Sequence, residues 1–208
     1  MTTQGKGLDQ HAVPSAIDLH NNNLRLIRMR WVAGGVMLIA TVFSVTILNL
    51  PLPTAALIIL SLIVLAYNTA MWAITRRAGE MWLNFIATAQ VAFDWLALAL
   101  FVHFTGGIES PAIAFFLFHL VMAALLLKER TSYIYAVLVI GVVAAIAALE
   151  AIGWLPHYTV IPALPPDLYR NPLYIAAILT FFSITVGVTI VLVTPIVLDL
   201  RAHHQCEA

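Results

Sequence analysis

Residues 173–198 read LYIAAILTFFSITVGVTIVLVTPIVL, an apolar stretch without a single charged side chain. An α-helix needs about 20 such residues to cross the hydrocarbon core of a bilayer. The whole chain has a similar character, because 62% of its 208 residues are hydrophobic and only 10% are charged. Charged residues make up roughly 25% of a typical soluble domain. The sequence therefore predicts that lipid solvates most of this chain.

Five more apolar stretches precede this one, and proline, glycine or charged residues separate them. They cover residues 31–50, 54–75, 82–102, 112–127 and 132–155. Strands of a membrane barrel would be alternating segments about half as long, so helices are favoured. We expect an all-α, multi-pass membrane protein with six transmembrane helices. Residues 1–24 are expected to form an N-terminal segment, 25–200 the transmembrane domain and 201–208 a short tail. Pro195 is expected to bend or end the last helix.

Lysine and arginine indicate the orientation, because the cytoplasmic loops of membrane proteins carry an excess of both. In a six-helix topology, only Arg170 falls on one side of the membrane. The other side carries Lys6, Arg25, Arg28, Arg30, Arg76, Arg77, Lys128, Arg130 and Arg201. We therefore expect both termini to be cytoplasmic.

Composition and spacing argue against several kinds of partner. The formal net charge is +0, whereas proteins that bind nucleic acids need a basic face. The single cysteine, Cys206, leaves no intrachain disulfide. His103 and His157 lack the spacing of metal ligands, and His203 and His204 are interpreted with Cys206 as a solvated tail. We predict no metal site and no nucleic-acid partner.

Asp94 is a carboxylate inside the third apolar stretch, about 13 Å from its outer end at ~1.5 Å of rise per residue. Such a group costs roughly 2.5–3.5 kcal/mol in a bilayer, so it should face the bundle and have a partner. His119 in the fourth stretch lies at nearly the same depth, and Gln90 lies one turn before Asp94 on the same helical face. We predict an Asp94–His119 pair with Gln90 beside it. The pair would bind a polar ligand head or a proton, or it would only join two helices.

Three other polar side chains lie within the apolar stretches: Tyr67, Asn68 and Glu150. Polar groups removed from water need hydrogen-bond partners. We expect these three to form interhelical hydrogen bonds or to lie at the membrane interface.

The connection between the third and fourth stretches is rich in glycine and aromatic residues. Residues 103–119 read HFTGGIESPAIAFFLFH. Gly106 and Gly107 permit positive φ and close backbone approach, and Pro111 suits the first turn of a helix. Backbone amides of such a loop can line a polar pocket at the head of an apolar groove. The alternative is a simple turn between two helices.

This loop and the six-helix pattern resemble the membrane sensor region of RegB/PrrB-type redox-responsive sensor histidine kinases of bacteria. In that family a Gly-Gly-x-x-Asn-Pro-Phe motif in this loop is associated with ubiquinone binding. Here Ser110 stands in the place of Asn, and Ala112 in the place of Phe. The resemblance implies a site for ubiquinone or menaquinone formed by Gly106, Gly107, Glu109, Ser110, Pro111 and His119. It also implies redox sensing in a two-component system of the bacterial cytoplasmic (inner) membrane.

The chain is expected to lack a catalytic domain. Histidine kinases carry dimerisation and ATP-binding domains after the last membrane helix, and only residues 201–208 follow here. We therefore expect a signal-input domain in the lipid bilayer rather than an enzyme. It would contact another membrane or signalling protein, or a second copy of itself. The alternative is a small structural or accessory subunit of a respiratory or photosynthetic complex, and a transporter is disfavoured because no internal repeat is found.

Overall fold

The computed structural model describes residues 16–77, 80–126, 129–160 and 163–206, and this part of the chain forms six α-helices without a β-strand. The helices are α1 (Ala16–Thr46), α2 (Thr54–Thr75), α3 (Glu80–Phe104), α4 (Phe115–Leu126), α5 (Glu129–Ala151) and α6 (Pro172–Cys206). Short 3₁₀ helices lie in the connections: η1 (Gly107–Glu109), η2 (Pro111–Ala114) and η3 (Leu168–Arg170). The all-α prediction is confirmed.

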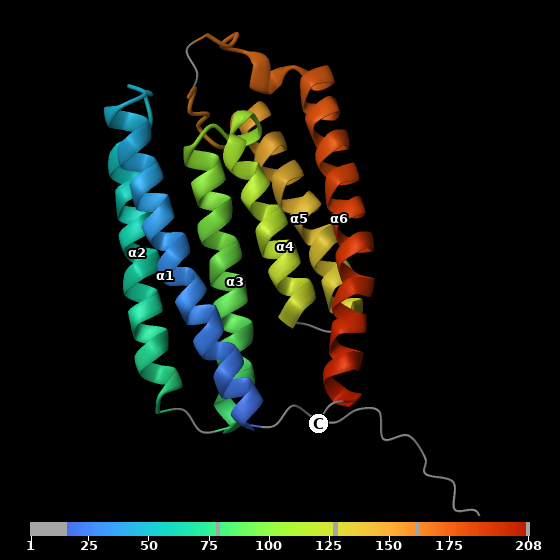
Figure 1. The fold of residues 1–208 in the computed structure, drawn as a ribbon. Coiled ribbons are helices and arrows are strands. Elements are labelled where there is room, and N and C mark those ends of the chain that lie inside the picture. The colour runs from blue at the N-terminus through green and yellow to red at the C-terminus, as the bar shows by residue number, and fades with distance from the viewer. Residues whose placement is uncertain (1–15, 78–79, 127–128, 161–162, 207–208) are drawn as a thin grey trace, which may run out of the picture.

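The helices stand side by side in an up-and-down bundle (Figure 1). α1 begins and α6 ends at the same end of the bundle, which we call the terminal end. The α3–α4 and α5–α6 connections lie at the opposite end, which we call the loop end. α1 packs along α2, and both contact α3, whereas α4 packs against α5 and α6. Because α3 also contacts α5, it joins the two groups of helices.

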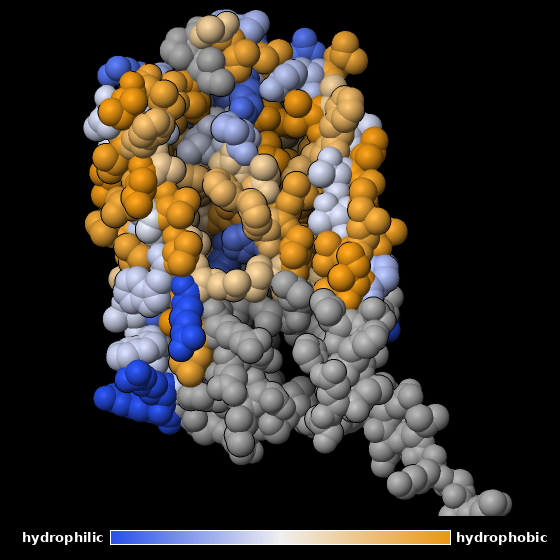
Figure 2. Space-filling model, in the orientation of Figure 1, coloured by the Kyte–Doolittle hydropathy of each residue, from blue (hydrophilic) through white to orange (hydrophobic). Residues whose placement is uncertain are grey.

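Apolar side chains fill the centre of the bundle and also cover its outside. The buried core includes Leu57, Leu98, Val102, Phe116, Leu120, Val139, Val143 and Val186. On the outside, Val32, Ile39, Val137 and Phe181 are each at least 67% exposed, and Figure 2 shows many apolar side chains on the face of the bundle that it presents. Apolar area removed from water is worth about 25 cal/mol per Å². This surface therefore suits lipid rather than water.

Four helices are long and apolar enough to cross a bilayer. These candidate spans are Ile27–Thr46, Thr54–Thr75, Arg130–Ala151 and Pro172–Val197. Two shorter apolar helical stretches, Ala92–Phe104 and Pro111–Ala124, belong to α3 and to η2 with α4. The described residues indicate a membrane protein with four candidate spans, and the other two of the six expected spans stay predictions.

The N-terminal helix differs from the prediction at both ends. α1 begins at Ala16, inside the segment 1–24 that was expected to precede the transmembrane domain. It ends at Thr46 rather than near residue 50. The earlier end is closed by Asn49, whose φ of 51° is left-handed, while the backbone N–H groups of Leu48 and Leu50 donate to the carbonyl oxygens of Phe43 and Ser44.

The last helix is longer than predicted. α6 continues through Pro195 to Cys206, so the expectation that Pro195 could end the helix is wrong. Proline removes one backbone N–H donor from a helix, a loss that α6 tolerates at this position. Residues 201–206, expected to lie in a tail, are therefore helical.

Candidate functional site

The α3–α4 connection is a compact turn built around two glycines. Gly106 and Gly107 have φ of 108° and 54°, which confirms the predicted positive φ. Pro111 begins η2, where its missing N–H leaves no intrahelical bond unmade. The turn therefore places Glu109, the last residue of η1, at the loop end (Figure 1).

Ser110, expected as a ligand-binding residue, is used within the turn itself. Its hydroxyl accepts a hydrogen bond from the backbone N–H of Ala112 at 3.1 Å. The same oxygen lies 2.6 Å from the hydroxyl oxygen of Thr105, at hydrogen-bond distance. Ser110 is 4% exposed, so its role in the structure is to hold the turn.

Gly107 lies directly against the carboxyl group of Glu150, near the end of α5. A Cβ atom at residue 107 would stand 2.5 Å from Cδ of Glu150 and closer still to Oε2. A Cβ at Gly106 would stand 2.9 Å from Cγ2 of Val160. The two glycines thus bring the loop backbone against α5 and against the α5–α6 connection.

Glu150 joins two histidines that lie on different segments. Its Oε1 is 2.7 Å from Nδ1 of His103 in α3, and its Oε2 is 2.7 Å from Nδ1 of His157 in the α5–α6 connection. The side chains of Glu150, His103 and His157 are 1%, 8% and 4% exposed. A buried carboxylate is costly unless hydrogen bonds compensate it. Both imidazoles supply them, which confirms the interhelical hydrogen bond expected for Glu150.

Glu109 completes a group of four side chains, His103, Glu109, Glu150 and His157, which we call the loop-end cluster. Oε2 of Glu109 lies 3.5 Å from Nε2 of His157, and both side chains are 4% exposed. This nitrogen is buried and has no hydrogen-bond partner among the described residues. Because an ionised Glu150 only accepts, Nδ1 of His157 donates to it, and a neutral His157 presents a lone pair at Nε2. The approach of His157 to Glu109 is therefore favourable only when one of the two carries a proton.

Aromatic rings enclose the loop-end cluster. Tyr169 in η3 stacks on His157, with ring centroids 3.8 Å apart and planes 8° apart. Tyr158 makes edge contacts with His103 at 5.5 Å and with Phe104 at 5.7 Å. These rings lower the local dielectric, which strengthens each hydrogen bond made there and raises the cost of each one left unmade.

Asp94 pairs with Arg30, so the predicted Asp94–His119 pair is wrong. The Arg30 guanidinium donates from Nε to Oδ1 of Asp94 at 2.6 Å and from Nη2 to Oδ2 at 2.8 Å. Nη1 of Arg30 donates to Oε1 of Gln90. Arg30 is 4% exposed, and Gln90 is completely buried. We call Arg30, Gln90 and Asp94 the α1–α3 cluster.

His119 lies outside both clusters. Its Nδ1 is 3.2 Å from the carbonyl oxygen of Phe115 in its own helix, and it is partly exposed. The prediction assumed that a short connection makes the third and fourth helices close neighbours. Instead, the main partners of α3 are α1, α2 and α5, and those of α4 are α5 and α6, while α3 and α4 meet through the rings of Trp95 and Phe116. Equal depth in the membrane therefore did not bring Asp94 and His119 together.

The other two polar side chains of the apolar stretches lie in α2. Asn68 donates from Nδ2 to the carbonyl oxygen of Ile27 in α1 at 2.9 Å, which confirms the expected interhelical hydrogen bond. Tyr67 stacks on Phe93 of α3 with centroids 3.9 Å apart, but its buried hydroxyl has no hydrogen-bond partner among the described residues, so the hydrogen bond expected for it is not formed there. Both residues therefore join α2 to its neighbours.

Arg30 and His157 were missed as site residues. Arg30 was counted among the cations that precede the first membrane helix, yet it faces the bundle from within α1. Its position just before an apolar stretch, together with the need of Asp94 for a partner, was the available signal. His157 lies in the proline-rich segment between α5 and α6, where hydropathy gives no indication of what a side chain contacts.

Metal binding is not supported in the described ranges. There, no group of three or more His, Cys, Asp or Glu side chains is arranged to hold a metal ion. His103 and His157 share a carboxylate instead. The side chains of His203, His204 and Cys206 lie outside those that the structure describes.

Neither a protein-family model, nor a curated protein, nor a solved structure matches the chain. Function is therefore inferred from the residues and their geometry.

Proposed function

We propose that this chain is the signal-input domain of a membrane sensor and that it binds the head group of a quinone at the loop-end cluster. The supporting observation is the buried Nε2 of His157, which faces Glu109 across 3.5 Å and lacks a hydrogen-bond partner among the described residues. A buried polar atom left in this state costs roughly 1–3 kcal/mol. A ligand that supplies the missing bond recovers that free energy. The resemblance of residues 106–111 to the RegB/PrrB sensor loop supports the same ligand class.

The oxidised and reduced forms of a quinone need different hydrogen-bond partners. A quinone oxygen only accepts hydrogen bonds, whereas a quinol hydroxyl also donates one. A protonated His157 donates from Nε2 and suits the quinone. A neutral His157 or an ionised Glu109 accepts and suits the quinol. The position of one proton in the loop-end cluster is thereby coupled to the oxidation state of the ligand.

The surroundings of the cluster suit the apolar tail of such a ligand. Ile152 and Trp154, which closely follow Glu150, are 63% and 79% exposed. Leu173, at the start of α6, is 78% exposed. A tail emerging at the loop end would lie against these side chains.

A conformational change caused by ligand binding at the loop end can be transmitted to the terminal end through α3, α5 and α6. His103 lies in α3, Glu150 in α5, and His157 in the connection that leads to α6. A ligand shifts a conformational equilibrium only by its different affinity for the two states. A ligand that repositions His157 changes how α5 and α6 are held against α3. In a bacterial inner membrane, with six spans and cytoplasmic termini, the conformational change would then be presented to a signalling protein in the cytoplasm.

Glu150→Gln is expected to lower the quinone that co-purifies with the protein by roughly tenfold or more, a loss of about 1.4 kcal/mol or more in binding free energy. Glutamine keeps the shape of glutamate, but its single oxygen cannot accept from both histidines in the present geometry. His157→Phe should have the same effect, because the ring remains against Tyr169 while the nitrogens are lost. The measurement is mass spectrometry of lipids extracted from protein purified in mild detergent.

His119→Leu is the matched control. It removes a histidine that the sequence suggested but that lies outside the loop-end cluster, so bound quinone should stay at the level of the unmodified protein. Circular dichroism and gel filtration would check that each variant is folded. Undiminished quinone in both Glu150→Gln and His157→Phe would refute the site. Absence of quinone, with larger membrane subunits co-purifying instead, would favour the structural-subunit function.

A further inference from the structure

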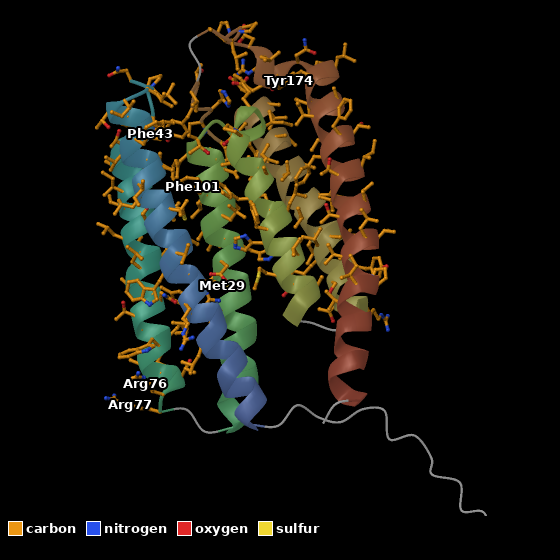
Figure 3. All side chains as sticks on the ribbon, in the orientation of Figure 1. Met29, Phe43, Arg76, Arg77, Phe101 and Tyr174 are labelled. Atoms are coloured by element: carbon orange, nitrogen blue, oxygen red, sulfur yellow. The ribbon has the colours of Figure 1, made fainter. Side chains whose placement is uncertain are left out.

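A cavity of about 340 Å³ lies between α1 and α2 at the terminal end, far from the loop-end cluster. Its lining residues are Leu24, Ile27, Arg28 and Trp31 of α1, together with Trp72 of α2 and Arg76, which follows α2. Figure 3 shows Arg76 and Arg77 at the terminal end of α2, and Figure 2 shows a hydrophilic patch at the same place. The lining therefore combines two guanidinium groups with two indole rings.

The positively charged side chains of this cavity favour the binding of an anion. Neither Arg28 nor Arg76 forms an ion pair within the described part of the chain. The guanidinium carbon of Arg76 lies 3.8 Å from the centroid of the Trp72 ring, a cation–π contact that orients it. Arginine matches the oxygens of a phosphate with paired N–H donors. One arginine from α1 and one from the end of α2 thus offer paired donors that suit a phosphate group.

The depth of the cavity indicates which phosphate reaches it. The apolar span of α1 begins at Ile27, and that of α2 ends at Thr75. Arg28 and Arg76 therefore lie where the apolar part of each helix meets the polar region, the level of lipid head groups. Trp31 and Trp72 lie about one turn further in, as interfacial tryptophans do.

The surface of α1 that runs from the cavity toward the loop end can accommodate an acyl chain. Gly35 lies one turn beyond Trp31, and a Cβ placed there would meet no heavy atom within 4 Å. One turn further on, Ile39 is 70% exposed. A chain that leaves the head group at Trp31 therefore meets a shallow apolar path along α1.

We propose that this cavity binds the phosphate of an anionic phospholipid, with Arg28 and Arg76 holding the head group and an acyl chain lying along Gly35. Among the described residues the lining has no carboxylate, and its two guanidinium groups repel the ammonium of a zwitterionic lipid such as phosphatidylcholine. The site therefore selects a lipid whose net charge is negative. This inference is independent of the loop-end cluster.

The test is native mass spectrometry of the full chain released from detergent micelles that contain either phosphatidylglycerol or phosphatidylcholine. We expect one phosphatidylglycerol to be retained in preference to phosphatidylcholine. The Arg28→Gln/Arg76→Gln double variant should weaken that retention by roughly tenfold or more, because it removes two charge-assisted contacts. Both side chains are exposed, so the fold should be kept, and circular dichroism would verify it.

Arg77→Gln is the matched control, because Arg77 is a neighbouring exposed arginine that does not line the cavity. It should retain phosphatidylglycerol like the unmodified protein. If Arg77→Gln loses as much bound phosphatidylglycerol as the double variant, general surface charge holds the lipid and the proposal is overturned. Equal retention of phosphatidylcholine would also overturn it. Displacement of the lipid by millimolar inorganic phosphate would identify a soluble-anion site instead and reject the lipid.

Discussion

Arg30→Met is expected to destabilise the protein by roughly 3–5 kcal/mol, the usual cost of removing one partner of a buried ion pair. Methionine keeps much of the length and the apolar character of arginine, so the space between α1 and α3 stays filled. The Asp94 carboxylate would remain in place, only 17% exposed and without its two-pronged guanidinium contact. Gln90 would lose one donor as well. Unfolding in mixed micelles of increasing dodecyl sulfate content, followed by circular dichroism, measures the change.

Two further variants separate the charge from the packing. Arg30→Met/Asp94→Leu removes both charges and is expected to recover most of the lost stability, because apolar residues often replace a buried ion pair at little cost. Arg77→Met, at an exposed arginine, should change the free energy of unfolding by no more than about 0.5 kcal/mol. An Arg30→Met variant as stable as Arg77→Met would show that the ion pair does not hold α1 to α3. A double variant as unstable as the single one would assign the loss to packing.

Gly107→Ala is expected to cost roughly 3–6 kcal/mol and to disrupt the loop-end cluster. An alanine at φ 54° carries about 1–3 kcal/mol of backbone strain. Its Cβ would also displace the Glu150 carboxyl group, whose Cδ would lie 2.5 Å away. That displacement breaks hydrogen bonds to His103 and His157, and bonds to charged groups are each worth about 1.5–3 kcal/mol. The same unfolding measurement detects the loss, and bound quinone should fall with it.

Gly153→Ala provides the comparison, because Gly153 has a φ of 81° but open space where its Cβ would stand. It should show the backbone cost of roughly 1–3 kcal/mol without the collision. A double-mutant cycle with Glu150→Ala tests the collision directly. If the carboxyl group is the obstacle, the combined loss should be at least about 1 kcal/mol smaller than the sum of the single losses. Additive losses, or equal losses in Gly107→Ala and Gly153→Ala, would contradict this explanation.

The two clusters differ in a way that bears on function. In the α1–α3 cluster, both oxygens of Asp94 accept from Arg30, whose third guanidinium nitrogen donates to Gln90. In the loop-end cluster, Nε2 of His157 lacks a hydrogen-bond partner among the described residues. A satisfied buried group stabilises the fold, whereas an unsatisfied one gains free energy when a ligand arrives. This contrast supports the proposal of a binding site at the loop end and of a structural role for Asp94.

Local properties of the sequence were sufficient to predict where the helices lie and which residues of the α3–α4 turn have positive φ, but not where α1 and α6 end. The stretch 54–75 appears as α2 with the same bounds, because a backbone surrounded by apolar side chains must satisfy its own polar groups within a helix. The positive φ of Gly106 and Gly107 followed from residue type, since glycine adopts it without steric cost. Each of these features depends on neighbours in the sequence.

The partners of the buried polar groups were decided by tertiary structure. The rise per residue gives the depth of Asp94 but not the direction in which its side chain points or which helix stands there. That direction leads to Arg30, 64 residues away in the sequence, because α3 packs against α1 while α4 packs against α5 and α6. His157 reaches Glu150 from an irregular connection, positioned by its stacking on Tyr169. Such pairings result from the packing of all the helices together. The hydropathy of the sequence gives no information about that packing.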